Sequence, residues 1–331
     1  MKLSCRMTLF CLVMTGASAI ASEPPITALA FTPDGDSVIA ASQAGLVVYS
    51  WPDLTRQRTI NCSTSNLHCL AFFPAAALLA VGGGNPSEDG SVELFSWPAG
   101  KHVSTLIEHT DSVRAVAWLS KTRLASAGFD RSIKIQETDL VRSSQPSPQQ
   151  QRESLRTLNG HSQSVSALCL LNGERILVSA DDDQSLRVWD LEKGEVIRSL
   201  NQHTKAVHDL ALRPSDGGLP MIASAAGDRT IRFWQPTIGR MVRYVRLKSE
   251  PLSIAWLDSD HIVAACVDGH IRVVDANDVA VTATQAAIDG WAYAIAVNAV
   301  DGTVAVAGSD GQIQRVELHP AVIGPRKPDA Q

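Results

Sequence analysis

A short turn of acidic and glycine residues recurs along this 331-residue chain at nearly constant intervals, and this recurrence constrains the fold more than any other feature. The steps between successive turns are 45, 41, 53, 45, 40 and 42 residues. A period of this length indicates a repeat architecture in which each unit is one supersecondary structure. The residues at the middle of the seven turns are Ala44, Asp89, Asp130, Asp183, Asp228, Asp268 and Asp310.

Each unit repeats the same order of short apolar segments. In the fourth unit an alternating segment at 165–171 is followed by small and β-branched residues at 176–180, a third segment at 185–190 and a weaker fourth at 195–200. Alternation with a period of two predicts β-strands, and Asp-Gly turns suit hairpins because both residues accept positive φ. Four antiparallel strands in about 40–45 residues are typical of a propeller blade. The sequence therefore predicts an all-β fold, a seven-bladed β-propeller of four-stranded antiparallel blades.

Units four and five also share a set of polar residues and a tryptophan at matching positions. "NGH" stands at 159–161 and "NQH" at 201–203, each ahead of a serine, an aspartate and a tryptophan. With seven units over roughly residues 26–319, the chain resembles the WD-repeat family. The resemblance implies a buried network in each of these blades, from tryptophan to serine, serine to histidine and histidine to aspartate. The expected members are His161, Ser179, Asp183 and Trp189 in the fourth blade, and His203, Ser224, Asp228 and Trp234 in the fifth.

The other units depart from this pattern to different degrees. The third unit keeps His109, Ser126 and Asp130 but has Gln136 at the tryptophan position. The second, sixth and seventh keep only the aspartate of the turn, and the first has lost it. Hydrophobic alternation is present in all seven, so it carries the fold prediction. Where the network is complete, we expect it to satisfy buried polar groups and to fix strand register.

Three short motifs suggest chemistry. His161, Ser179 and Asp183 are the residue types of a hydrolytic triad, but Ser179 lies mid-strand without a nucleophile elbow, and the set recurs in other units. "DDD" at 181–183 has carboxylates that suit a hard cation but lacks the spacing of a calcium loop. "GGG" at 82–84 lacks the Lys-Ser/Thr of a phosphate loop and is interpreted as a flexible loop between the second and third strands of blade two. The sequence predicts no cofactor.

The first 21 residues have the three parts of a secretory signal peptide. Lys2 and Arg6 precede a short apolar run, and small residues allow cleavage after Ala19 or Ala21. Cleavage would change the net charge from −5 to −7. A protein with a negative net charge does not attract the phosphate backbone, so nucleic acid is not expected as a partner. The sequence thus predicts a signal peptide at 1–21, a propeller at 22–320 and a Pro-rich tail at 321–331. We expect periplasmic or secreted protein, without membrane insertion after cleavage.

Cysteine content and the chain ends bear on stability. Cys169 and Cys266 lie in apolar segments and are expected to be buried hydrophobic residues. Cys62 and Cys69 are close enough in sequence that an oxidising compartment would permit a bridge. Few residues precede the first strand and the tail is Pro-rich, so the last blade is expected to be three-stranded or weakly closed. Residues 139–156, rich in Ser, Pro and Gln, are expected to form a mobile loop.

The predicted function is that of a non-catalytic protein-interaction scaffold acting outside the cytoplasm, with other proteins as partners. Candidate contact residues on one face are Phe129, Arg131, Arg229 and Trp291, since aromatic residues and arginine are enriched at binding centres.

Two alternatives stay open: a propeller hydrolase or lyase with a site at the central channel, and a lectin-like ligand binder. The first strands begin with apolar residues, which favours the scaffold over the enzyme, and an aromatic content of 5% disfavours the lectin. These starting residues are Ile26, Leu67, Val113, Val165 and Val207.

Overall fold

The computed structural model describes residues 23–318, apart from residues 74, 76, 139–155, 172–174 and 215–216. The expected signal peptide, the C-terminal tail and all but the last residue of the expected loop at 139–156 lie outside the described residues. In the described part of the chain, no helix has the length and apolar character needed to span a membrane.

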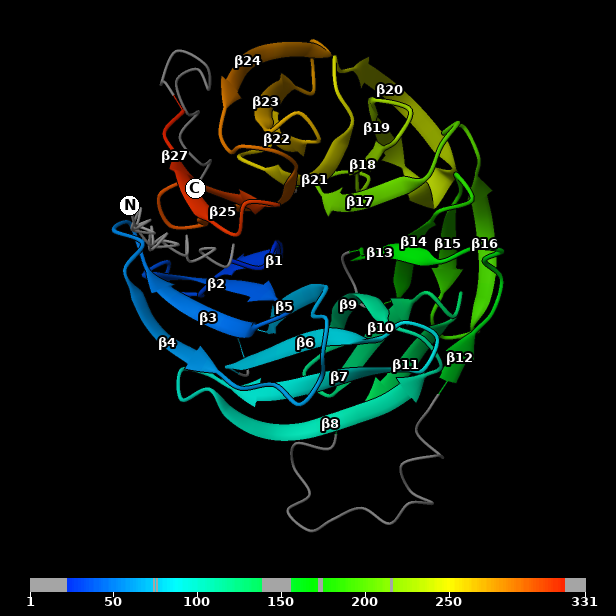
Figure 1. Cartoon of the computed structure of the whole chain (residues 1–331). Coiled ribbons are helices and arrows are strands. Elements are labelled where there is room, and N and C mark those ends of the chain that lie inside the picture. The colour runs from blue at the N-terminus through cyan, green and yellow to red at the C-terminus, as the bar shows by residue number, and fades with distance from the viewer. Residues whose placement is uncertain are drawn as a thin grey trace, which may run out of the picture.

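Seven antiparallel sheets stand around a central axis, which confirms the predicted seven-bladed propeller (Figure 1). Each sheet is a simple meander in chain order. The first strand of each blade lies nearest the axis, and the fourth strand lies at the circumference. The strands of blades one to four are β1 (Ile26–Phe31), β2 (Ser37–Ser42), β3 (Gly45–Ser50), β4 (Arg56–Ile60); β5 (Cys69–Phe73), β6 (Leu78–Asn85), β7 (Asp89–Ser96), β8 (Lys101–His109); β9 (Val113–Ser120), β10 (Arg123–Gly128), β11 (Ile133–Glu137), β12 (Arg156–Leu158); and β13 (Val165–Leu170), β14 (Ile176–Asp181), β15 (Leu186–Asp190), β16 (Glu195–Leu200).

Blades five and six complete the four-stranded set, and a 3-10 helix at Pro236–Ile238 links two strands of blade five. Blade seven has three strands among the described residues. The strands of these blades are β17 (Val207–Leu212), β18 (Ile222–Ala226), β19 (Thr230–Gln235), β20 (Arg240–Arg246); β21 (Pro251–Trp256), β22 (His261–Cys266), β23 (His270–Asp275), β24 (Ala280–Ala286); and β25 (Ala292–Val297), β26 (Val304–Gly308), β27 (Ile313–Val316).

The tight turns between second and third strands form as the Asp/Gly pattern predicts. In six blades the residue after the middle of the turn has positive φ, a conformation that glycine adopts without steric cost. Three of the six are not glycine, which is a local strain that the surrounding blade holds in place. The six residues are Gly45, Arg131, Gln184, Arg229, Gly269 and Gly311.

The hydrophobic core is divided into clusters that lie between blades rather than within them. The second strand of each blade is buried on both faces, because a neighbouring blade covers each face. Six clusters fill the six successive interfaces from blade one to blade seven. A smaller cluster around Ile26, Ala40 and Ala307 fills the interface between blades seven and one. No blade therefore buries its own apolar surface alone.

The ring closes between blades seven and one with polar contacts as well as this small cluster. The Asn298 side-chain amide donates to the carbonyl of Gly35 at 3.0 Å, and the Trp51 indole donates to the Thr303 hydroxyl at 2.9 Å. Both contacts join turns at the end of the propeller that carries the first-to-second-strand turns. Closure thus uses packing and side-chain hydrogen bonds in the described part of the chain.

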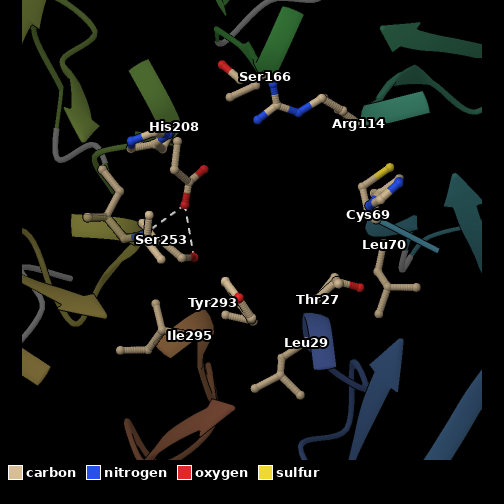
Figure 2. Close-up of a pocket in the computed structure, with 18 of the residues that line it drawn as sticks. Thr27, Leu29, Cys69, Leu70, Arg114, Ser166, His208, Ser253, Tyr293 and Ile295 are labelled. Carbon is tan, nitrogen blue, oxygen red and sulfur yellow. Dashed lines mark hydrogen bonds between the residues drawn. The ribbon is translucent and has the colours of Figure 1, made fainter. Parts of the chain in front are cut away.

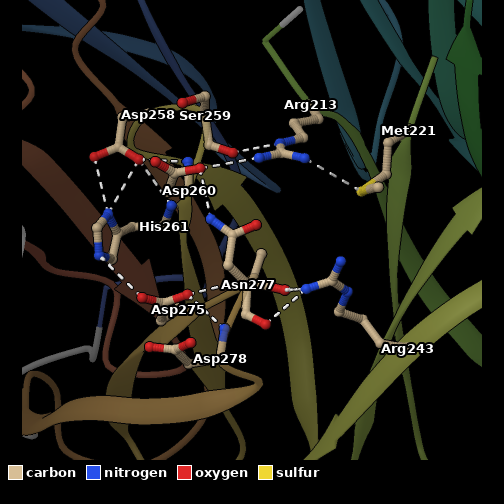
Figure 3. A network of polar contacts seen from close by, with 11 residues as sticks. Arg213, Met221, Arg243, Asp258, Ser259, Asp260, His261, Asp275, Asn277 and Asp278 are labelled. Carbon is tan, nitrogen blue, oxygen red and sulfur yellow. Dashed lines mark hydrogen bonds and ion pairs between the residues drawn. The ribbon is translucent and has the colours of Figure 1, made fainter. Parts of the chain in front are cut away.

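A set of arginines on the outermost strands ties four pairs of neighbouring blades together; we call these the outer contacts. In each case the guanidinium donates to backbone carbonyls in the third-to-fourth-strand turn of the next blade. Arg156 reaches three carbonyls at 2.6–2.9 Å, and Arg243 reaches Ala276 and Asn277 at 3.1 and 2.6 Å (Figure 3). All four arginines sit at the same register position of their sheets. They are Arg58, Arg156, Arg198 and Arg243.

The interpretation of Gly82–Gly84 as a flexible loop was wrong. These glycines belong to β6, which runs to Asn85 and pairs along its whole length with β7. A Cβ at Gly82 would lie 2.6 Å from the Cys69 sulfur, and a Cβ at Gly83 would lie 2.7 Å from the carbonyl oxygen of Ser65. The glycines are needed because other chain segments press against this strand, which a loop prediction from composition does not capture.

The outer contacts predict a specific loss of stability. We expect Arg156→Ala to lower the free energy of unfolding by about 1–2 kcal/mol, since three hydrogen bonds from one charged group are lost at an exposed position. Arg175→Ala is the matched control, because the ion pairs of Arg175 among the described residues are with Asp190 and Glu192 of its own blade. Urea unfolding measures both variants. Equal midpoints for the two would show that the outer contacts do not stabilise the ring.

Candidate functional site

The structure brings together a histidine, a serine and an aspartate in each of blades three, four and five. In blade five His203 lies 2.7 Å from the Ser224 hydroxyl and 2.9 Å from Asp228, and the Trp234 indole donates to Ser224 at 2.8 Å. Blade three has the His109 contacts to Ser126 and Asp130, both at 2.8 Å. A neutral histidine with its proton on Nδ1 gives each group one consistent role.

Burial favours the neutral form of the histidine in this network, whereas hydrogen bonds favour the charged form of the aspartate. Burial lowers the pKa of His203 to about 4, so this ring is neutral near pH 7. Burial opposes ionisation of Asp228, but hydrogen bonds from Thr230 and His203 outweigh it and lower the pKa of Asp228 to about 2. The resulting carboxylate also accepts the backbone N–H of Thr204, which fixes the loop leading into the blade.

The assignment of Asp183 to the fourth-blade network was wrong. His161 contacts Ser179 at 2.5 Å, and Trp189 donates to Ser179 at 2.8 Å, but the acid that His161 contacts is Asp181, at 2.8 Å. Asp183 lies on the surface and accepts a hydrogen bond from Ser162. The spacing in blade five suggested Asp183, but alternate residues of a strand share a face, so Ser179 and Asp181 of β14 both face His161.

The same geometry argues against a hydrolytic triad at these residues. Ser179 and Asp181 are 0% exposed, and the Ser179 hydroxyl already bonds to both His161 and Trp189. A nucleophile must reach a substrate carbonyl, and none can approach a fully covered hydroxyl. The network is therefore part of the blade interior.

Two blades that lack the histidine hold other buried charged groups, which the sequence reasoning missed. In blade six Arg272 is 4% exposed and donates to both oxygens of Asp268, at 2.9 and 2.6 Å; this pairing raises the pKa of Arg272 above its usual value. In blade two Glu93, 1% exposed, accepts the backbone N–H of Thr64 at 2.5 Å. The alternating "HIRVVD" and "SVELF" segments place both residues on buried faces, which was the available signal.

The central channel forms a cavity of about 290 Å³ lined by the first strands of all seven blades (Figure 2). In most blades the first strand carries a β-bulge at its second position, which leaves that residue unpaired and turns its side chain toward the channel. The residues at this position, together with the equivalent residue of blade two, are Thr27, His68, Arg114, Ser166, His208, Leu252 and Tyr293.

Six of these seven residues are polar, so the argument from apolar strand starts was wrong. That argument used the preceding residue of each strand, such as Val113 or Val207, which is buried between blades. The bulge makes the following residue the one that faces the channel. Apolar strand starts thus do not decide between a scaffold and a channel enzyme.

Four of the channel residues bond to the next blade; we call these the inner contacts. Thr27 donates to the carbonyl of Leu67, which precedes β5, and Ser166 donates to the carbonyl of Val207 in β17, each at 2.5 Å. Arg114 donates to Asp182 at 2.8 Å, and His208 donates to Glu250 at 2.7 Å. These polar side chains are engaged in holding the ring together.

The predicted contact residues lie at the same end of the propeller as the inner contacts. Phe129 is 41% exposed; its ring lies 5.0 Å below the Arg114 guanidinium and 6.3 Å from the His68 ring. Trp291 is 54% exposed and stacks edge-on against Tyr293 at 6.0 Å. The structure thus brings both aromatics to the rim of the channel.

Arg131 and Arg229 occupy exposed turn positions on blades three and five. Trp291, which could equally have packed under a loop, is instead open to solvent.

Cysteines and acidic clusters give no further chemistry in the described residues. Cys62 and Cys69 are free thiols, and burial raises the pKa of each to about 12, so neither is a reactive thiolate at neutral pH. No group of three or more potential metal ligands occurs among the residues that the structure describes, including the acidic run at 181–183.

Comparison with known proteins identifies the repeats. The family model described as "WD domain, G-beta repeat" matches residues 100–135, 152–190 and 194–235. Each matched segment begins near the outermost strand of one blade and continues through three strands of the next, ending in blades three, four and five. These are the blades that hold the histidine networks. These three segments therefore match WD40 repeats, and they lie within a seven-bladed propeller.

Curated relatives support the same class. The chain is 32% identical over 165 residues to nuclear distribution protein nudF 1 of Talaromyces marneffei, covering 49% of this chain and 33% of that protein. It is 28% identical over 228 residues to nuclear distribution protein PAC1 of Arthroderma otae, covering 65% and 46%. It is 27% identical over 212 residues to WD repeat-containing protein srw1 of Schizosaccharomyces pombe, covering 63% and 35%. The aligned part spans less than half the length of each of these relatives.

The corrected network predicts unequal effects of two neighbouring aspartates. We expect Asp181→Ala to lower the free energy of unfolding by about 3 kcal/mol, because it leaves His161 and the turn N–H groups of Asp183 and Ser185 without their buried acceptor. Asp183→Ala should change it by about 0.5 kcal/mol or less, as an exposed substitution. Urea melts of the two variants decide this. A larger loss for Asp183→Ala would restore the spacing-based assignment.

Proposed function

We propose that this chain is a non-catalytic protein-interaction scaffold whose partners dock on the channel rim. The observation that carries the proposal is the pair of exposed aromatic rings, Phe129 and Trp291, at the rim of a stiff ring. Each is backed by a residue of the channel wall, so the rings are held in place before a partner arrives. Preorganised aromatic residues contribute strongly to binding because little side-chain freedom is lost.

The relatives support this proposal in a limited way. Their printed names describe nuclear distribution proteins and a WD repeat-containing protein, and none names a reaction. The buried state of Ser179 and the engagement of the channel polar groups with neighbouring blades agree with a binding role. Partners of this chain are proposed to be proteins.

Binding should depend on the rim and not on exposed aromatics in general. We expect the double variant Phe129→Ala, Trp291→Ala to lose partner capture at least tenfold in quantitative affinity purification with cross-linking, since central aromatic anchors are worth about 2 kcal/mol or more. Tyr244→Ala is the matched control, because Tyr244 is 52% exposed on the outermost strand β20. Equal capture by wild type and the double variant, or loss only in Tyr244→Ala, would place docking elsewhere.

We also propose that the protein acts outside the cytoplasm, a proposal that rests on the sequence of residues 1–21. The expected product begins at Ile20 or Ser22, after removal of Lys2 and Arg6. N-terminal sequencing and intact mass of the protein from its native cells test this. A retained Met1 or Lys2 in the exported or total protein would refute cleavage.

A further inference from the structure

We propose that the central channel binds one cationic group carried on an aliphatic stem, a primary amine or guanidinium of the lysine or arginine kind, with Asp209 as its counter-ion. This inference deepens the proposed function and rests on it where the cation belongs to a partner protein. The same chemistry could come from a free small amine, so the experiment below separates the two sources.

Asp209 is the only acid at its position in the ring. It follows the bulge residue His208 on β17 and lines the channel. The equivalent residue in every other blade is small and uncharged, so the sheet geometry does not require a carboxylate there. Those residues are Ala28, Cys69, Ala115, Ala167, Ser253 and Ala294.

The partners of the Asp209 carboxylate are all neutral. It accepts the N–H groups of Leu210 and Ile254, each at 2.8 Å, and the hydroxyl of Ser253 at 3.0 Å. These contacts orient the carboxylate but supply no positive charge. Burial raises the pKa of Asp209 to about 6 despite the three hydrogen bonds. An unpaired, half-buried carboxylate gains free energy when a cation approaches it.

Two basic side chains that line the same cavity are already bonded to other acids. Arg114 bonds to Asp182, and His208 bonds to Glu250 on the next blade. Because these pairs are part of the inner contacts, moving either side chain to Asp209 would leave its own acid without that partner and loosen a blade interface. The missing positive charge is therefore best supplied from outside the chain.

The channel wall suits the stem of such a ligand. Leu29, Leu70 and Ile295 lie around the opening, and Leu168 and Ile254 line the same cavity (Figure 2). Methylene groups of a lysine or arginine side chain pack well on apolar walls while the charged head seeks a polar partner. The cavity of about 290 Å³ is at the small end of ligand pockets, about 300–1,000 Å³, which fits one side chain rather than a large ligand.

The test is titration of the full chain with acetyl-Ala-Lys-Ala-amide and acetyl-Ala-Arg-Ala-amide, followed by NMR. The neutral isostere of the second, with citrulline for arginine, is the ligand control. We expect binding of both cationic peptides and at least tenfold weaker binding of the citrulline peptide. Asp209→Asn should weaken the cationic peptides at least tenfold, whereas Asp183→Asn, an exposed acid outside the channel, should leave them unchanged.

A second variant covers the case in which Asp209→Asn does not fold. Leu252→Lys places an ammonium group in the channel wall next to blade six's Ser253, at a position with no hydrogen-bonding side chain to lose. We expect it to fold and to block both peptides by pairing with Asp209 internally. Undiminished peptide binding by a folded Leu252→Lys protein would contradict the proposal.

Affinity should also fall with acid. Since the pKa of Asp209 is about 6, the fraction ionised, and with it the affinity, should drop roughly tenfold between pH 7 and pH 5. The other titratable groups near the cavity are His68, Cys69, Arg114, His208 and Tyr293 in its wall, Glu250 and Asp182 at its rim, and Cys169 behind the wall. Asp209→Asn must flatten most of the dependence if Asp209 is the counter-ion.

The outcomes separate the sources and the two proposals. Tighter binding of the lysine peptide than of free cadaverine supports a partner side chain, and equal binding supports a small amine at the same site. Equal binding of the citrulline and arginine peptides, or no effect of Asp209→Asn, overturns the inference. If partner capture still depends on Phe129 and Trp291 while no cationic peptide binds, the scaffold stands and the channel site does not.

Discussion

Apolar packing between neighbouring blades is the interaction on which this structure depends. Each second strand is covered on one face by the preceding blade and on the other by the following blade, so every cluster belongs to two blades. Burial of apolar surface contributes roughly 25 cal/mol per Å² and has no direction of its own. Directional contacts must therefore set the angle and register at which one blade meets the next.

The inner contacts and the outer contacts fall at the same four interfaces of the ring. Thr27 and Arg58 join blade one to blade two, and inner and outer contacts coincide again at blades three to four, four to five, and five to six. Blade two has Ser104 and blade six has Ala283 at the outer position, so no arginine is available there.

The interface of blades five and six is reinforced further at the opposite end of the propeller from the rim. Arg213 bonds to Asp260 at 3.0 Å, and Asn277 bonds to the same carboxylate at 2.8 Å (Figure 3). The hydrogen bond from Asn277, then the charge and hydrogen bond of Arg213, hold the pKa of Asp260 below its usual value. Inner and outer contacts together thus join blades three, four, five and six without a break.

The period of the sequence was enough to predict the fold, because hydrophobic alternation and turn chemistry are local and repeat in every blade. The histidine networks of blades three and five were likewise set by residue type and spacing. Blade four shows the limit of spacing. Acids stand at both Asp181 and Asp183, and the choice depends on which one the strand turns inward. The prediction of which residues face the channel was wrong for a similar reason. A β-bulge changes which side chain of the first strand points to the axis, and composition does not reveal a bulge.

The sequence also did not predict the side-chain contacts between neighbouring blades. Arg156 and Arg198 look like ordinary surface residues in a weak fourth strand, and only the position of the next blade shows what they bind. The same holds for Gly82–Gly84, whose need for glycine comes from segments distant in sequence. Long-range proximity is the information that a single sequence does not carry.

The exposed aromatic rings at the channel rim, Phe129 and Trp291, lie beside channel residues that make no inner contact. His68 and Tyr293 hold the channel position in blades two and seven, and instead of bonding to the next blade each packs against an exposed ring, Phe129 or Trp291. At the four interfaces with inner contacts, the equivalent channel side chains bond to the next blade. This propeller therefore presents its exposed rim aromatics at interfaces that lack an inner contact. There the blades are joined by apolar clusters and by hydrogen bonds away from the channel, such as the one from the Trp118 indole to the Ala71 carbonyl and the two that close the ring.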